Sequence, residues 1–139
     1  EAEIDIIARH QAGFNPRSLT EAGIRPVAGA ADIHAAREAA SRIEVAPAVM
    51  AYLVDVCRAT RTSPAVRLGV SPRGATSLLR TARVWAFLQG RGFVTPDDVK
   101  TMAPSTLAHR LGLRAEANLE GITAVNVISG VLAATPVPR

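Results

Sequence analysis

One short stretch of the chain combines two residues that favour a helix start with one that opposes it. In RLGVSPRGATSLLR (residues 67–80), Ser71 is a good N-cap and Pro72 suits the first helical position. Arg73 follows in the first turn, where the helix dipole disfavours a cation by about 0.3–1 kcal/mol. Two explanations stand. Either Arg73 and the free N–H groups of this turn bind an anion such as phosphate, or the guanidinium is solvated and its small cost is tolerated.

The other reactive residues form no familiar catalytic or metal-binding motif. The three histidines are far apart in the sequence, and a phosphate-binding loop is impossible because the one lysine, Lys100, follows a valine. Cys57 falls on an apolar helical stripe and is expected to be a buried structural thiol. Asp97 and Asp98 stand at a helix start, where capping and the dipole account for them. We therefore expect neither catalytic residues nor a metal site in this chain by itself.

The composition favours one helical domain. The chain has 139 residues, of which 48% are hydrophobic, mostly Ala, Val, Leu and Ile, and only 4% are aromatic. The formal net charge of +4 permits a polyanionic partner, although heavy use of Arg and Ala also fits a GC-rich genome. No apolar run reaches membrane-spanning length and no signal peptide opens the chain. We therefore expect a cytoplasmic protein without a membrane partner.

Helical periodicity, caps and breakers divide the sequence into a series of helices. The first helix is already under way at residue 1 and ends near Gly13, so the chain reads as a piece of a longer protein. We expect a connector over residues 17–29, then helices over residues 30–41, 47–60, 72–89, 96–111 and 123–134, with Pro104 splitting the helix that starts at residue 96. Val66, Leu68 and Val70 are expected to form an extended segment against the helices.

These elements predict an all-α bundle of about five to six helices. Residues 1–29 are interpreted as the end of a preceding domain with a connector, and residues 30–139 as the helical domain with a short tail. The stripes predict which side chains are buried: Val49, Met50, Leu53, Val54 and Cys57; Ala75, Leu78, Leu79, Ala82, Trp85 and Ala86; and Val125, Ile128, Val131 and Leu132. Arg73, Ser77, Arg80 and Arg83 fall on the opposite face of the helix over residues 72–89.

The segment that contains Arg73 resembles a known family. Residues 68–113, LGVSPRGATSLLRTARVWAFLQGRGFVTPDDVKTMAPSTLAHRLGL, resemble the C-terminal lid of the MoxR family of AAA+ ATPases. Within them, GVSPRG resembles the sensor 2 motif of that family, and GRGFVTPDDVK resembles the connection to the next helix. The similarity continues through RPVAG and RATRTSP and covers nearly the whole chain from Gly13. Gly74 departs from the alanine that is commoner in the family, and it is expected to loosen the first turn slightly.

The resemblance implies a role within a larger protein. In the family, the sensor 2 arginine, here Arg73, reaches the terminal phosphate of ATP, which is bound with magnesium to the preceding α/β core. Ser71 and Pro72 are further candidates for the nucleotide site. The resemblance also implies ATP hydrolysis by the parent protein, rings with neighbouring subunits, usually hexamers, chaperone-like remodelling, and partners with von Willebrand factor A domains. The phosphate loop and the magnesium-binding acids of such a core are not found in this sequence.

A second interpretation comes from a different class of protein. The net charge and the arginine-bearing helix face permit a stand-alone basic helical module that binds nucleic acid, or a helical module that binds a partner protein. The sequence has neither a helix-turn-helix signature nor an aromatic platform on which bases could stack. We therefore expect nucleic acid to bind weakly and without sequence preference, if it binds at all.

Overall fold

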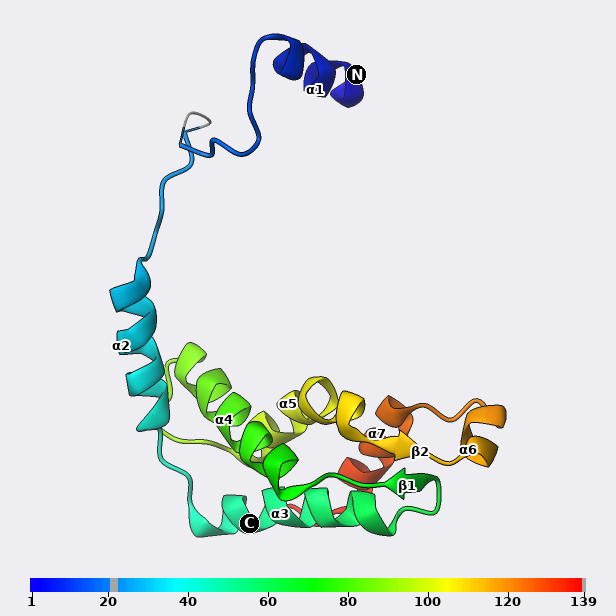
Figure 1. Ribbon diagram of the computed structural model, residues 1–139. Helices are drawn as coiled ribbons and strands as arrows, with labels where there is room; N and C mark the ends of the chain where they lie inside the picture. The colour runs from blue at the N-terminus through cyan, green and yellow to red at the C-terminus, as the bar shows by residue number, and fades with distance from the viewer. Residues whose placement is uncertain (21–22, 139) are drawn as a thin grey trace. The chain divides into compact units, whose positions relative to one another are not determined.

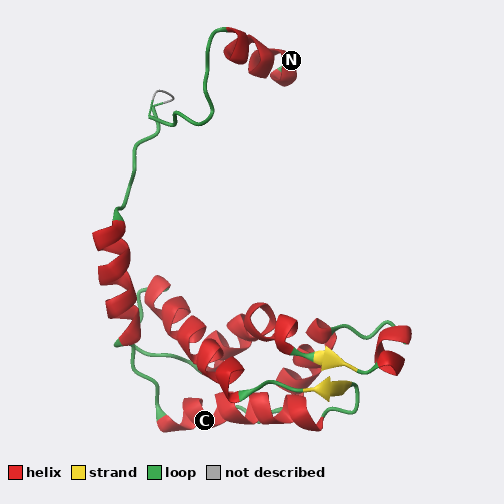
Figure 2. Ribbon diagram, in the orientation of Figure 1, coloured by secondary structure: helices red, strands yellow, loops and turns green. Residues whose placement is uncertain are grey.

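The structure, a computed structural model, describes residues 1–20 and 23–138. Figures 1 and 2 show that these residues form helices joined by loops, together with two short strands. The elements are α1 (Ala2–Gln11), α2 (Ala30–Ser41), α3 (Pro47–Thr62), β1 (Val66–Leu68), α4 (Pro72–Leu88), α5 (Pro96–Leu107), the 3-10 helix η1 (Ala108–Arg110), β2 (Gly112–Leu113), α6 (Ala115–Leu119) and α7 (Ala124–Ala134). The prediction of an all-α fold is confirmed.

The chain divides into two units, Glu1–His34 and Ala35–Arg139. In the first unit α1 ends at Gln11, and Gly13 takes the left-handed conformation (φ 89°) expected of a glycine that ends a helix. The predicted connector over residues 17–29 contains no helix or strand where it is described, and residues 21 and 22 lie outside the described residues. All residues of α1 are exposed.

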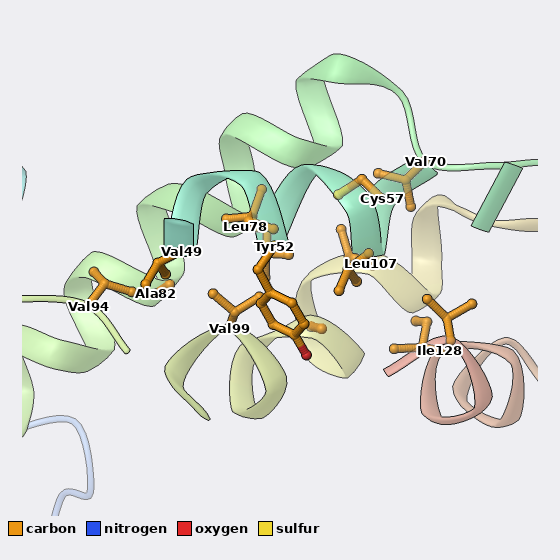
Figure 3. Packing of buried hydrophobic residues seen from close by; sticks show 14 of the residues in the cluster. Val49, Tyr52, Cys57, Val70, Leu78, Ala82, Val94, Val99, Leu107 and Ile128 are labelled. Atoms are coloured by element: carbon orange, nitrogen blue, oxygen red, sulfur yellow. The ribbon is translucent and has the colours of Figure 1, made fainter. Parts of the chain in front are cut away.

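The second unit packs α3, α4, α5 and α7 around one hydrophobic core. The helix α3 contacts α4, α5 and α7, and α4 packs most extensively against α5. Figure 3 shows side chains from all four helices meeting between them. The fully buried members of this core include Val56, Cys57, Val70, Leu78, Ala82, Ala86, Val99, Ala103, Leu107 and Ile128. The helix α4 is held in place by packing against this core.

Two predicted core residues are exposed. Met50 is 44% exposed, because the buried row of α3 begins at Val49 and continues through Tyr52, Leu53 and Val56 instead. Val125 is 48% exposed, because it stands in the first turn of α7, one position away from the row that faces the core. Apolar periodicity alone did not separate neighbouring positions at the edge of a stripe.

Pro104 does not split its helix, contrary to the prediction. The helix α5 runs without interruption from Pro96 to Leu107, with Pro104 inside it. A proline in a helix interior removes one backbone hydrogen bond and destabilises the helix by about 3 kcal/mol or more. Ala103 and Leu107 on either side are fully buried in the core, and their packing holds the helix continuous across the proline. The predicted second piece is reduced to the single turn of η1, and the short α6 was not predicted.

The predicted extended segment forms a strand at its first three residues. β1 pairs antiparallel with β2, with Val66 opposite Leu113 and Leu68 opposite Gly112. Gly112 permits the close approach, since a Cβ there would lie 3.2 Å from the Cβ of Leu68. The ladder fixes the end of β1, and only residues 69–71 separate that strand from the start of α4.

Candidate functional site

Ser71, Pro72 and Arg73 form the start of α4, as the sequence predicts. Ser71 is the N-cap, and its Oγ accepts a hydrogen bond from the backbone N–H of Gly74 at 3.3 Å. Pro72 occupies the first helical position, where its missing N–H would be unpaired in any case. The three residues are exposed together in one turn. The structure thus brings all three predicted site residues to one place on the surface.

The side chain of Arg73 is not bonded to another group among the described residues. Within residues 1–20 and 23–138, its guanidinium takes part in none of the ion pairs, and only its backbone carbonyl is engaged, by the hydroxyls of Thr76 and Ser77 at 2.9 Å each. The first turn of α4 contains no acidic residue. A fixed positive charge therefore stands beside the positive end of a helix dipole, which is an arrangement suited to an anion.

The start of α5 shows the opposite electrostatic arrangement. Thr95 and Asp98 form a reciprocal capping box, and Asp97 is exposed with Lys100 Nζ 3.0 Å from its Oδ1. Asp98 also accepts two hydrogen bonds from Arg91 and is 2% exposed. Burial raises the pKa of Asp98, but the hydrogen bonds from Arg91 and Thr95 outweigh it, so the pKa lies below its ordinary value. The first turn of α5 thus carries acids in a structural role, whereas the first turn of α4 carries a cation.

The loop before α4 is tied to the last turns of α3. Val70 donates its backbone N–H to Thr60 Oγ1 at 3.0 Å, and its carbonyl accepts a hydrogen bond from Arg61 Nε at 2.8 Å. Neither of these two side chains of α3 was predicted to act at the start of α4. Thr60 does continue the helical row of Cys57 at a spacing of three residues, but a polar residue adds nothing to an apolar pattern.

Gly74 has a packing role beyond its effect on the helix propensity. It is buried, and a Cβ at this position would lie 2.6 Å from Val70 Cγ1 and 3.5 Å from Arg110 Cδ. The sequence predicted only that glycine loosens the first turn. In the structure, the absence of a side chain lets the first turn of α4 rest directly on Val70, which is itself fully buried.

The two other arginines predicted on this face of α4 differ in their surroundings. Arg80 is exposed and borders a shallow apolar hollow with Val84, Trp85, Leu88 and Met102. Arg83 is partly buried, and its Nε is enclosed without a hydrogen-bond partner among the described residues. Neither stands in the first turn with Arg73, so neither shares its relation to the helix terminus.

The described part of the chain offers little else that could hold a cofactor. Residues 1–20 and 23–138 contain no group of three or more His, Cys, Asp or Glu side chains placed to bind a metal ion. Cys57 is buried, and burial raises the pKa of its thiol to about 11. Among these residues, no helix has the length and apolar character needed to cross a membrane.

The matching family model decides the assignment. The model described as AAA lid domain matches residues 58–131, which include the last turns of α3, the loop 69–71 and Arg73. The chain belongs to the AAA lid domain family. The match begins at the turn of α3 that holds Val70 and ends within α7, so it covers the four helices of the core in whole or in part.

The relatives of this lid domain include MoxR proteins, as the resemblance predicts. Protein YeaC of Bacillus subtilis is 36% identical over 136 residues, which cover 98% of this chain and 41% of that protein. Protein MoxR of Methylorubrum extorquens is 37% identical over 81% of this chain and 38% of its own length. Chaperone MoxR1 of Mycobacterium tuberculosis is 30% identical over 87% of this chain and 34% of its own length. The lid domain thus spans about two-fifths or less of the length of these relatives.

A solved structure has the same fold. A crystal structure of a protein from Cytophaga hutchinsonii, named as a candidate ATPase, superposes with a TM-score of 0.69 and 26% identity over 73% of this chain and 34% of that one. Identity at this level and a common fold agree with the family assignment. The resemblance to the lid of MoxR-family AAA+ ATPases is therefore confirmed.

Proposed function

We propose that this lid domain works within a MoxR-type AAA+ ATPase, where Arg73 acts as the sensor 2 arginine and contacts the γ-phosphate of bound ATP. The observation that supports this most directly is the state of Arg73: exposed, without a carboxylate partner among the described residues, and beside the free N–H groups at the start of α4. An arginine fork placed at a helix N-terminus suits phosphate oxygens.

The chemistry of the nucleotide itself belongs to the rest of the protein. ATP with Mg²⁺ supplies the phosphoryl group that is transferred to water, and an α/β core outside these residues holds both. Within the lid, Arg73 binds and orients the terminal phosphate, and Ser71 and Pro72 shape the turn that presents it. Ser71 Oγ already accepts the hydrogen bond of the cap, so its hydroxyl proton is the group left to donate to a phosphate.

The contact made by Arg73 would couple the nucleotide to the lid as a whole. Arg73 is part of α4, and α4 packs on α5 and α3, so a change at the phosphate moves a rigid body and not one side chain. We extend the proposal to rings with neighbouring subunits, to remodelling of client proteins in the cytoplasm, and to partners with von Willebrand factor A domains. The name of one relative, chaperone MoxR1, supports the remodelling role.

The test is the substitution Arg73→Ala in the full-length protein. ATP turnover should fall about a hundredfold, since the lost contact acts on a phosphate whose charge is changing. ADP affinity should change less than ATP affinity, because ADP lacks the phosphate that Arg73 contacts. Arg80→Ala is the matched control: the residue is also an exposed arginine of α4, but it lies two turns further along the helix.

Stability must be measured alongside activity. Arg73→Ala should change the free energy of unfolding of the lid by less than about 1 kcal/mol, because the residue is exposed and the helix dipole disfavours a cation there. The lid by itself should show no ATP turnover. A variant that loses stability while turnover holds, or turnover by the isolated lid that depends on Arg73, would contradict the proposal.

A further inference from the structure

The loop that carries Arg73 lies directly against the backbone of α3. A Cβ at Gly69 would be 2.7 Å from both Cα and Cγ of Arg61 and 2.9 Å from its backbone nitrogen. These distances are shorter than any Cβ contact that a folded protein tolerates, so only glycine permits this approach. Gly69 therefore packs directly against the last turn of α3.

Both backbone groups of the next residue, Val70, are bonded to α3. Its N–H donates to Thr60 Oγ1 at 3.0 Å, and Thr60 Oγ1 in turn donates to the carbonyl of Cys57 at 2.7 Å. The carbonyl of Val70 accepts the hydrogen bond from Arg61 Nε at 2.8 Å. Thr60 and Val70 are both 0% exposed. Hydrogen bonds between buried groups hold geometry firmly, because their loss leaves polar groups without water.

The side chain of Val70 contacts the first turn of α4. Its Cγ1 lies 2.6 Å from the place where Gly74 would carry a Cβ, so the first turn of the helix sits on the Val70 side chain. Arg73 directly precedes Gly74 in that turn. The contacts thus run from Thr60 and Arg61 through Val70 to the turn that presents Arg73.

We propose that Thr60 and Arg61 are positioning residues for Arg73: through Val70 they set the direction in which α4 leaves the loop, and hence where the guanidinium meets the nucleotide. This inference rests on the proposed function of Arg73. A displacement of about 1 Å at a reacting group can lower a rate by about a hundredfold, so a modest loosening of this loop is enough to matter.

Two substitutions remove the hydrogen bonds to Val70 singly in the full-length ATPase. Thr60→Val keeps the shape of the buried side chain without the hydroxyl, and Thr60→Ser restores the hydroxyl. Arg61→Met keeps the Cβ and Cγ against Gly69 and removes the Nε donor. Matched controls lie on the same helix: Thr62, whose exposed hydroxyl donates to Ala59 O, and Arg58, paired with Asp55 on the surface. Thr62→Val and Arg58→Met leave Val70 untouched.

We expect Thr60→Val and Arg61→Met each to lower kcat about tenfold, with KM for ATP changed by less than about twofold. Thr60→Ser and the two controls should keep wild-type turnover. Because the positioning residues act through Arg73, neither substitution should reduce turnover further when it is combined with Arg73→Ala. A purely structural role would not produce this loss of effect in the Arg73→Ala background.

The outcomes separate this inference from the proposed function. If Arg73→Ala lowers turnover but Arg61→Met does not, or if its effect multiplies with that of Arg73→Ala, Arg61 does not position Arg73 and the inference is wrong. If Thr60→Val unfolds the lid, the turnover of Arg61→Met tests the inference, because Arg61 is exposed and its substitution leaves the core intact. If Arg73→Ala leaves turnover unchanged, both the proposed function and this inference fail.

Discussion

Asp98 accepts hydrogen bonds from both Nη groups of Arg91, at 2.7 and 2.5 Å, although Arg91 lies in the turn after α4 and Asp98 in the first turn of α5. The same carboxylate accepts the backbone N–H and the hydroxyl of Thr95 at 2.7 and 2.9 Å. One buried side chain therefore joins the turn after α4 to the first turn of α5. Since α4 and α5 pack against each other, this pair fixes the end of the hairpin opposite the start of α4.

The variant Asp98→Asn should destabilise the lid by about 1.5–3 kcal/mol, the range for a lost hydrogen bond to a charged group. Because the pKa of Asp98 is lowered in the folded protein, its stabilising effect is complete above the ordinary value of 3.8 and is lost as the pH falls through the folded pKa. Urea unfolding between pH 6 and pH 2 measures this dependence. The variant should lose less stability than the wild type below about pH 4. Asp97→Asn, at an exposed position, should follow the wild-type curve.

Substitution by alanine should have opposite effects on stability at Gly69 and at Gly130. Gly69→Ala should destabilise the lid by about 1–3 kcal/mol or more, because the new methyl group meets backbone atoms of Arg61 that cannot yield. Gly130→Ala in α7 should stabilise it by about 0.5–1 kcal/mol, since a Cβ there meets nothing within 4 Å and alanine favours the helix. The melting temperatures of both variants test the close contact between Gly69 and α3. Equal shifts of the melting temperature in the same direction would contradict that contact.

The thiol of Cys57 should resist alkylation in the folded lid. It is 1% exposed, and burial raises its pKa to about 11, so the reactive thiolate is scarce at pH 8. One equivalent of thiol should react in a denaturant, and almost none on the same timescale without it. Stability should also fall as the pH rises from 9 towards 11, because the unfolded chain then releases a proton that the folded thiol retains. Fast labelling of the folded protein would contradict this packing.

Trp85 is partly buried, as the sequence predicts, but it stands at the border of the core. It lines the shallow hollow with Val84, Leu88 and Met102 and is absent from the buried cluster. We therefore expect Trp85→Ala to cost about 2 kcal/mol, below the 3–5 kcal/mol typical of a fully buried tryptophan. Leu88→Ala, at a residue that is 66% exposed, is the control and should cost less than about 1 kcal/mol. Acrylamide should quench the Trp85 fluorescence partially; free quenching would place the ring outside the fold.

The helix starts could be predicted because their signals are local. Ser71 with Pro72, and Thr95 with Pro96, satisfy the first turn from within a few residues, and the structure has both helices at the predicted first residue. Thr123 likewise caps α7 through a capping box with Asn126. The exposed turn of Arg73 followed from the same reasoning. A cation at a helix start is visible in the sequence because it breaks a local rule.

The parts that could not be predicted depend on contacts between distant elements. Pro104 breaks a helix by local rules, and only the burial of its neighbours in the core outweighs that effect. The bonds from Thr60 and Arg61 to Val70 cross nine to ten residues of chain, and no spacing rule connects a helix end to a loop at that distance. The pairing of Arg91 with Asp98 depends on the turn after α4, where Gly90 takes a φ of 70°.

The pairing of β1 with β2 also has a consequence for the order of folding. Along the chain, β1 precedes α4 and β2 follows α5, so the pairing of the two strands closes one long loop. The entropy lost in closing that loop is offset only if contacts within the loop have already formed. The hairpin of α4 and α5 consists of near-neighbour contacts and can form earlier at lower entropic cost. The hairpin of α4 and α5 should therefore form before the ladder, and the pairing of β1 with β2 should be among the last contacts to form.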